Sequence, residues 1–459
     1  MCMQNFKFYL LAFLISSFLP LAAQDVPENP LPTPGRGGEI HDVVDQMVKE
    51  GEERRKIQNA KAQAWLDERM IPGHTLKVLP TGKELHIERV QAILAAKHSI
   101  YLSAFAFYAD EIGGTFGTLL CKKAQEGLDV RLMVDTIGAR KFKSEGKLTK
   151  RLRDCGIPVL FFNNHRTWGL NNIVYVIHEK LLIVDGETVI LGGSGWARHY
   201  TTHSLDTGWR DLDARIDGPA ACYFHNKFLE SIRNIKKFEN GSRFSRLTKN
   251  EALKSYGKSE HYECEEVAQG DAKVFAVHSN PFFSKDRPIL AAYATMMQVT
   301  GKGDINLYAP YFIPHKDFSA LLSIYALLGR NVNIITNSIG SNDDGPKVVL
   351  AMYKTVRGLM RDGVKIHLWQ KKSTMHRKGG IIGGKYAYFG SDNLDRRGQN
   401  YSSESIAITD DAETVKKAQA EFDEDLKHTI LLTEEIYKRD WKSFGRLMKF
   451  YIDYIIDYM

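Results

Sequence analysis

The sequence predicts an α/β protein built from two similar, α/β/α-layered halves related by a pseudo-twofold axis. Three observations support this fold class. The chain has 459 residues and a hydrophobic fraction of 43%, enough for two packed domains. Strand-like apolar runs alternate with helical patterns, which is typical of layered α/β structures. The order of these segments also occurs twice along the chain.

Four segments carry the internal repeat. They are "IYLSAFAFYADEIG" from Ile100 with "INLYAPYFIPHKDF" from Ile305, "GLDVRLMVD" from Gly127 with "GRNVNIITN" from Gly329, "LRDCGIPVLFF" from Leu152 with "LMRDGVKIHLW" from Leu359, and "HEKLLIVDGETVILGGS" from His178 with "HRKGGIIGGKYAYFGSD" from His376. The offset between partners stays within 198 to 207 residues. We therefore predict a first half at 76–235, a connector at 236–271 and a second half at 272–430, with the active site where the halves meet.

The N-terminal region reads as an export signal. Lys7 precedes an apolar run from Phe8 to Ala23, and the run ends in the small residues Ala22 and Ala23. We predict a signal peptide at 1–23 and export to the periplasm or the medium. An uncleaved anchor is the second choice, because the run is shorter than the roughly 20 residues of a spanning helix.

Two further segments flank the halves. Residues 24–75 are expected to form a linker and an accessory helix, at about 40–70, that lies on the main body. Residues 431–459 form a tail rich in aromatic residues. The tail either packs on the second half or touches a bilayer surface, and a peripheral membrane association would follow from the second alternative.

The net charge and the cysteines do not settle which partner the protein binds or whether its cysteines are oxidised. The net charge of +7 favours anionic partners such as phospholipid headgroups or nucleic acid. Beyond the signal, the cysteines are Cys121, Cys155, Cys222 and Cys264. Three disulfide pairings and free buried thiols all remain open, and the spacing matches no zinc motif.

The stretch "VIHEKLLIVD" places His178 and Lys180 two residues apart in an apolar run. Side chains alternate along a strand, so both point to the same face. Burying both is unfavourable unless an anion binds there. His376 and Lys378 repeat the pattern in the second half, and a pseudo-twofold axis would bring the two pairs to one site.

Two opposed imidazoles suit displacement at phosphorus. One neutral histidine attacks, and the opposite protonated histidine gives a proton to the leaving oxygen. The two lysines, expected to be charged at any physiological pH, would hold the non-bridging oxygens. Neither a metal nor another cofactor is expected, because Leu182 interrupts a zinc H-E-x-x-H pattern. Trp196 likewise interrupts a G-x-S-x-G nucleophile motif.

With these motifs the chain resembles the phospholipase D superfamily, whose signature is H-x-K-x(4)-D followed by a glycine-rich segment. "HEKLLIVD" matches the signature, and "HRKGGIIG" matches its His and Lys, with "GSDNLDRR" at the same spacing. "TNSIGSND" and "GWRDLDARIDGPAA" resemble the bacterial cardiolipin synthase branch in particular.

The resemblance implies roles for individual residues. His178 would be the nucleophile that forms a phosphohistidine, and His376 the general acid and later the base. Glu404 would support His178, and Asp211 would support His376. Substrate contacts are expected from Ser391 and Asn393, and structural roles from Asp185, Gly192, Gly193 and Gly390.

The chain departs from the family pattern at two places. Gly383 stands at the second-half Asp position, and Gly195 or Trp196 stands where the first half would carry Asn. Because Asp185 is expected to face away from the His/Lys site, its loss in the second half should affect rigidity more than chemistry.

The preferred function is transfer of a phosphatidyl group between glycerophospholipids resembling phosphatidylglycerol, at a membrane surface. Two alternatives remain: a secreted phosphodiesterase or nuclease acting on nucleic acid, and a catalytically degenerate member that binds phosphate.

Overall fold

The computed structural model describes most of the chain. It covers residues 37–138, 146–163, 174–201, 207–241, 256–257, 260–445, and the single residues 448, 450, 452 and 456. The predicted signal peptide at 1–23 lies outside the described residues.

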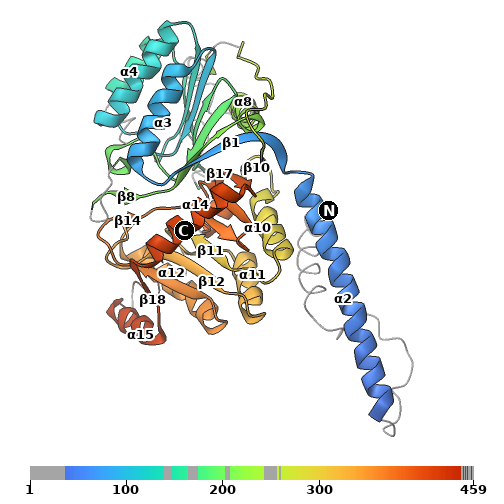
Figure 1. Ribbon diagram of the computed structural model, residues 1–459. Coiled ribbons are helices and arrows are strands. Elements are labelled where there is room, and N and C mark those ends of the chain that lie inside the picture. The colour runs from blue at the N-terminus through green and yellow to red at the C-terminus, as the bar shows by residue number, and fades with distance from the viewer. Residues whose placement is uncertain are drawn as a thin grey trace.

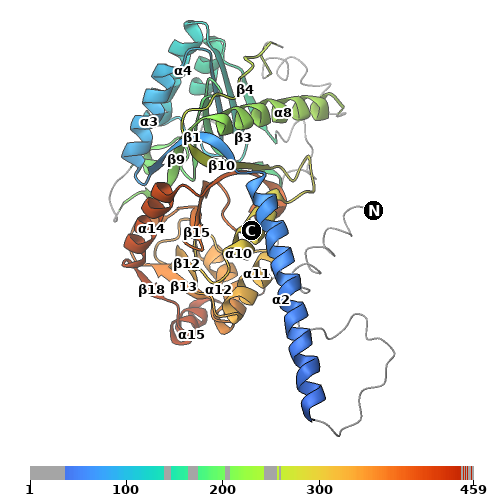
Figure 2. The same cartoon turned by 45° about the vertical axis from the view of Figure 1, so that its right-hand side comes forward.

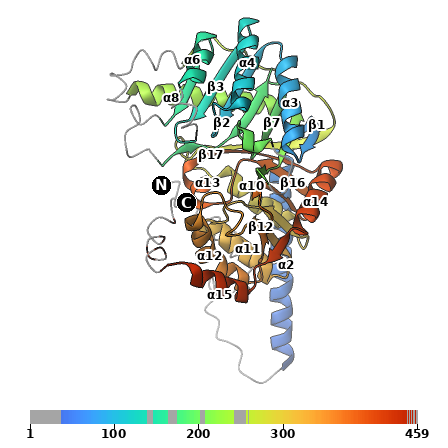
Figure 3. The ribbon, with the colours of Figure 1, turned by 90° about the vertical axis from the view of Figure 1, so that its left-hand side faces the viewer.

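One mixed sheet of sixteen described strands runs through both halves (Figures 1 and 3). The first half contributes β1 (Ile71–Leu79), β2 (Ser99–Ala104), β3 (Asp129–Asp135), β4 (Val159–Phe162), β6 (Lys180–Val184), β7 (Thr188–Gly192) and β9 (Asp213–Asp217). The second contributes β10 (Ala272–Ser279), β11 (Ile305–Tyr308), β12 (Val332–Asn337), β13 (Lys365–Trp369), β15 (Gly379–Ile382), β16 (Tyr386–Gly390), β17 (Ser402–Thr409) and β18 (Thr429–Leu431). The sixteenth, β5 (Val176–Ile177), pairs with β17 beside the main path.

The strand order shows the duplication directly. It runs β4-β3-β2-β6-β7-β9-β1 through the first half and β10-β17-β16-β15-β11-β12-β13-β18 through the second. Apart from the added β18, each half repeats the other in mirror order about the β1–β10 pair. The predicted pair of similar halves is therefore confirmed, and the pseudo-twofold axis passes between β1 and β10.

Helices cover both faces of the sheet, because its central strands are buried on both sides (Figure 2). The first half has α3 (Gly82–Ala95), α4 (Glu111–Gln125) and α6 (Lys147–Asp154) on one face and α8 (Pro219–Gly241) on the other. The second half has α10 (Pro288–Val299), α11 (Lys316–Leu327) and α12 (Pro346–Arg361) on one face and α14 (Ala412–Leu426) on the other. One core cluster, between α8 and α14, continues from the first half into the second.

The segment predicted as linker and accessory helix differs from the expectation. Residues 71–75 belong to β1, which pairs with β9 and β10 and so joins the halves. The long helix α2 (Gly37–Asp67) packs on α10 through its last turns, where Leu66 is fully buried. The rest of α2 extends away from the body (Figures 1 and 2). The expectation that the whole helix lies on the body is thus wrong, because among the described side chains of α2 only Trp65 and Leu66, in its last turn, join the hydrophobic core.

The described part of the aromatic tail packs on the second half. In α15 (Glu434–Ser443) the ring of Tyr437 stacks on Tyr353 with centroids 5.4 Å apart. Phe444 meets the same ring at 6.1 Å and is buried. Most of the terminal stretch after Gly445 lies outside the described residues.

The four cysteines form two disulfides. Cys121 pairs with Cys155, and Cys222 pairs with Cys264. The first joins α4 to the end of α6, and the second ties α8 to the connector between the halves.

Candidate active site

Each H-x-K motif lies where the chain changes strand partner. β5 (Val176–Ile177) pairs in parallel with β17 of the other half, and His178 follows it directly. β14 (Thr374–Met375) pairs in parallel with β8 (Trp209–Arg210), and His376 follows it. The chain then enters β6 or β15, which pair within their own half. Each His and Lys pair therefore lies at a break between two strands, and both crossings join one half to the other. Figure 1 shows the β8–β14 crossing between the halves.

His178 contacts a carboxylate from the second half. Its backbone N–H donates to the Ser403 carbonyl at 3.0 Å. This register brings the His178 Nδ1 to 2.8 Å from the Glu404 Oε1. The Ser391 hydroxyl donates to the other Glu404 oxygen. Glu404 is almost fully buried, and burial raises the pKa of its carboxyl, with Asp392 adding to the effect.

His376 repeats the arrangement with a carboxylate from the first half. Its backbone N–H donates to the Arg210 carbonyl at 2.8 Å, and its Nδ1 lies 2.6 Å from the Asp211 Oδ2. The Leu212 N–H donates to the other oxygen of Asp211 at 3.0 Å. A Cβ at Gly193 would lie 2.1 Å from that oxygen, so glycine is required beside the carboxylate.

The two lysines are buried beside the histidines. Lys180 Nζ donates to the His178 carbonyl at 2.5 Å, and Lys378 Nζ donates to the His376 carbonyl at 2.7 Å. Burial, followed by the charges of Lys180 and Lys378, lowers the pKa of His178. Because a lysine of each half acts on this one imidazole, the four side chains form one electrostatic centre.

The lysine charges depend on pH. Burial lowers the pKa of Lys180 to about 7, and the Lys378 charge adds to the effect. Burial lowers the pKa of Lys378 to about 8, against the raising effects of Asp211 and Glu404. The expectation of a permanent charge at physiological pH is therefore wrong for these side chains. A phosphodiester between them would favour the charged forms.

The central residue of each motif makes its contacts away from the four His/Lys side chains. Glu179 accepts a hydrogen bond from the Ser403 hydroxyl of the second half. Arg377 is fully buried, donates to the Asp211 and Pro80 carbonyls of the first half at 3.2 and 3.0 Å, and pairs with Asp425 at 2.7 Å. Both residues therefore fix one half against the other behind the histidines.

Two buried residues that the sequence analysis missed hold the chain just before each histidine. Asp135, at the end of β3, accepts the Ile177 N–H at 3.0 Å. Asn337, at the equivalent end of β12, accepts the Met375 N–H at 2.9 Å. The repeat contained the signal, since the aligned segments from Gly127 and Gly329 end at these two residues.

Aromatic side chains also line the site, and no motif in the sequence predicted them. The Phe105 ring lies 5.1 Å from His178, and the rings of Trp209 and Tyr200 lie 4.4 and 5.8 Å from His376. Tyr200 also explains the missing first-half Asn, because a Cβ at Gly195 would lie 2.6 Å from its ring.

Asp185 lies away from the four His/Lys side chains. Its backbone adopts φ 54°, and its carboxylate accepts the N–H groups of Lys97, His98 and Ser99 at 2.8, 2.7 and 2.7 Å. The equivalent Gly383 has φ 68°, and a Cβ there would lie 2.2 Å from the Thr300 Cβ. The second half thus keeps the turn while Thr300 fills the space of the missing carboxylate.

The remaining motif residues fall into two groups. A Cβ at Gly192 would lie 2.2 Å from the Asp213 carboxylate, and a Cβ at Gly390 would lie 2.3 Å from the Ser405 carbonyl. Asn393 is buried, and its Oδ1 has no hydrogen-bond partner among the described residues. Glycine is therefore required at these two positions by the close approach of neighbouring atoms. The Asn393 Oδ1 remains available to accept a hydrogen bond.

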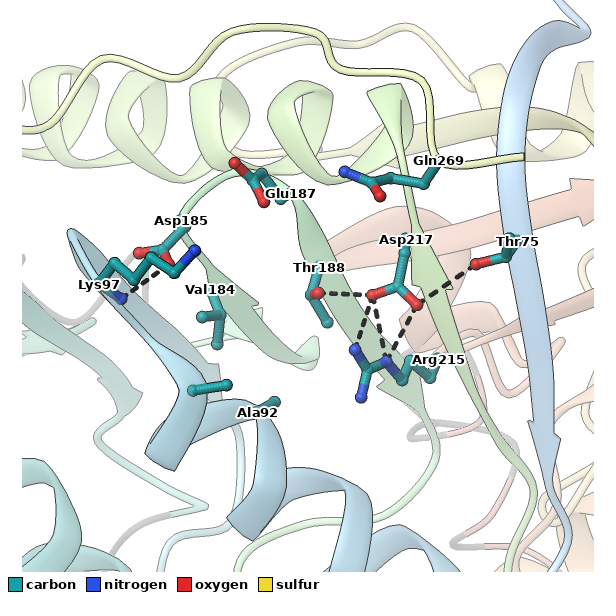
Figure 4. A pocket seen from close by; sticks show the side chains of 11 residues that line it. Thr75, Ala92, Lys97, Val184, Asp185, Glu187, Thr188, Arg215, Asp217 and Gln269 are labelled. Carbon is teal, nitrogen blue, oxygen red and sulfur yellow. Dashed lines mark hydrogen bonds and ion pairs between the residues drawn. The ribbon is translucent and has the colours of Figure 1, made fainter. Parts of the chain in front are cut away.

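A polar cavity of about 330 Å³ lies at the Asp185 end of the first half (Figure 4). Arg215 and Asp217 pair within it, and Thr75 and Thr188 donate to Asp217. None of the four His/Lys side chains lines this cavity. It is separate from the centre described above.

Two absences concern the described part of the chain. No helix in it combines the length and apolar character needed to cross a bilayer. No group of three or more His, Cys, Asp or Glu side chains in it is arranged to hold a metal ion.

Comparison with known proteins places this geometry in a family. A family model described as "Cardiolipin synthase, PLD-like domain" matches residues 90–228 and 298–426, one segment in each half. Cardiolipin synthase 1 of Bacillus anthracis is 28% identical over 391 residues, covering 82% of this chain and 72% of the relative. Cardiolipin synthase of Oceanobacillus iheyensis is 29% identical over 357 residues, covering 78% and 69%.

A solved structure shows the same fold. Phosphatidylserine synthase of Haemophilus influenzae Rd KW20 matches with a TM-score of 0.65 and 17% identity, over 88% of this chain and all of the other. Since the family model covers more than half of the chain, with one match in each half, the chain belongs to the phospholipase D-like family of cardiolipin synthase domains.

Proposed function

We propose that the chain is a phosphatidyltransferase of the cardiolipin synthase type, acting on glycerophospholipids through a phosphohistidine intermediate. The family assignment makes it a phospholipase D-like phosphatidyltransferase. The observation that carries the finer proposal is the pair of His–carboxylate contacts, each built across the two halves at 2.8 and 2.6 Å.

In the first step His178 attacks phosphorus. With its Nδ1–H donating to Glu404, the Nε2 lone pair is free to form the P–N bond. The bond from phosphorus to the headgroup oxygen breaks, and the electron pair goes to that oxygen. His376, in its protonated form, donates the Nε2 proton to the leaving oxygen.

In the second step His376, now neutral, acts as a base. The acceptor hydroxyl gives its proton to His376 while its oxygen attacks phosphorus. The P–N bond breaks, and the electron pair returns to the Nε2 of His178. A lipid hydroxyl as acceptor gives transfer, and water gives hydrolysis.

The two buried lysines would stabilise the phosphorane-like transition state. Lys180 and Lys378, in their charged forms, would donate to the non-bridging oxygens as negative charge increases on them. Ser391, whose hydroxyl donates to Glu404, and Asn393 would be the substrate contacts that the family register implies.

Export and membrane contact belong to the same proposal. Two disulfides favour an oxidising compartment, and the predicted signal at 1–23 would deliver the chain there. The substrate then lies in the outer face of a membrane, which the protein would approach from the aqueous side.

The test uses protein lacking residues 1–23, phosphatidylglycerol vesicles and product analysis by mass. Cardiolipin and free glycerol are expected, and the His178→Ala control should form neither. Phosphatidic acid in place of cardiolipin would show a hydrolase. Absence of any lipid product, with cleavage of single-stranded DNA instead, would overturn the lipid proposal.

A further inference from the structure

Two short loops at equivalent positions of the repeat expose an isoleucine each. "DTIG", residues 135–138, begins at the last residue of β3, and "NSIG", residues 337–340, begins at the last residue of β12. Ile137 and Ile339 are each 42% exposed. A single exposed apolar residue is ordinary, but the same residue type at the same exposure in both halves is a feature of the repeat.

Both loops are held in shape by their own hydrogen bonds. Asp135 accepts the Ile137 and Gly138 N–H groups at 2.7 and 3.0 Å. In the other loop the Ser341 hydroxyl donates to Asn337 at 3.0 Å and accepts the Ser338 N–H at 3.0 Å. The isoleucines are therefore presented by fixed turns and have little freedom to fold back onto the core.

Both loops also lie next to the catalytic centre. A Cβ at Gly138 would lie 2.7 Å from the Phe105 ring, which is in contact with His178. Asn337 holds Met375, the residue before His376. Each isoleucine thus lies two residues beyond the side chain that positions one H-x-K motif.

The burial of the centre sets a condition on its substrate. The side chains of His178 and His376 are 12% and 4% exposed. A phosphodiester anchored by acyl chains stays near its bilayer, so it reaches these side chains when the rim of the site touches the membrane. Apolar side chains on that rim would then enter the boundary between headgroups and acyl chains.

We propose that Ile137 and Ile339 are paired membrane-contact residues that seat the active-site rim on a phospholipid bilayer. This inference rests on the proposed function, because it takes a membrane lipid as substrate. Each half supplies one contact, and the two flank the centre that both halves build.

The charges around the second loop indicate that the contact is mainly apolar. The exposed Asp343 and Asp344 follow Ile339 on the same loop. Because these carboxylates cannot attract an anionic bilayer, ionic attraction does not drive the contact there, and binding to vesicles should persist at raised salt.

The experiment measures sedimentation with phosphatidylglycerol vesicles for wild type, Ile137→Ser, Ile339→Ser and the double variant. Leu327→Ser is the matched control, since Leu327 is 69% exposed at the end of α11, at the opposite end of β12 from Asn337. Turnover is measured on the same vesicles and on a short-chain phosphatidylglycerol dissolved as monomers. Circular dichroism confirms that each variant is folded.

Each serine should weaken vesicle binding about tenfold, and the double variant about a hundredfold. Turnover on vesicles should fall with binding, while turnover on monomeric lipid stays unchanged. Ile137→Trp and Ile339→Trp should bind more tightly, because tryptophan favours the membrane interface.

Wild type that does not bind vesicles, a double variant that binds as wild type does, or binding lost at raised salt would each overturn the inference. The proposed function fails separately, if wild type shows no turnover on either lipid. Vesicle binding is measured without turnover. It therefore tests the membrane contact whether or not the protein proves to be active.

Discussion

The two halves build the same His–carboxylate contact with the same backbone and different side chains. His178 contacts Glu404, which also accepts a hydrogen bond from Ser391. His376 contacts Asp211, which packs closely against Gly193. The shared part is the strand crossing that brings each carboxylate from the opposite half. The strand topology therefore gives the two sites their symmetry. The side chains around each carboxylate make them different, and the proposal assigns the nucleophile to one site and the acid to the other.

A second difference concerns the residues that hold the motifs. Asp135 supports the first-half motif, and burial raises its pKa to about 6. Asn337 supports the second-half motif and does not titrate. The first half thus relies on an ionisable support, while the second keeps the same hydrogen bond at every pH.

Among the side chains that differ between the halves, Glu404 and Asp211 should have the largest effect on kcat. Glu404→Gln and Asp211→Asn should each lower kcat by about 10²- to 10⁴-fold, because the imidazoles lose orientation and charge support. A donor lipid with a nitrophenol leaving group separates the two roles. The first step then needs no proton from His376, so the first-turnover burst of nitrophenol should recover in Asp211→Asn and not in Glu404→Gln. Equal losses with both donors would contradict the assigned roles.

The lysines should set the pH profile. With pKa values of about 7 and 8, Lys180 and Lys378 lose their charges as pH rises, so kcat/KM should fall above this range. Lys378→Met should lower kcat/KM about 10²- to 10³-fold. The substitution also removes a charge that lowers the pKa of His178. The pKa of His178 should therefore rise, and the acidic limb of the kcat/KM profile should move to higher pH. An acidic limb that stays in place or moves lower would argue against one shared centre.

The smallest effect on activity is expected at the turn that differs most between the halves. Asp185→Asn weakens three charge-assisted hydrogen bonds and should lower the free energy of unfolding by about 2–3 kcal/mol. Gly383→Ala should also destabilise, because its Cβ would meet Thr300. Thermal denaturation measures both, and turnover per folded molecule should stay within about twofold. A large loss of turnover would give Asp185 a chemical role.

The sequence predicted the parts of this site that local spacing encodes. The duplicated motifs indicated His178, His376 and the lysines, and the family register indicated Glu404 and Asp211 as their partners. Strand alternation also predicted that Asp185 faces away from the His/Lys side chains, although the strand breaks at the histidines.

Other features depend on contacts between segments far apart in the chain. The partner change after Ile177 follows from pairing with Ser403, which no local pattern records. The supports Asp135 and Asn337 act on segments 42 and 38 residues away. The lowered pKa values of the lysines arise from burial at the junction of the halves, so they follow only from the assembled fold.

The central claim is that the first-half histidine carries the phosphatidyl group. The most direct measurement incubates His376→Asn with the nitrophenol donor, quenches in alkaline denaturant, and determines the mass of each histidine-containing peptide. We expect a phosphatidyl adduct on the peptide with His178, because the second step lacks its base. The double variant His178→Ala/His376→Asn should show none. An adduct on His376 in the reciprocal His178→Asn variant, or no adduct in either, would contradict the account.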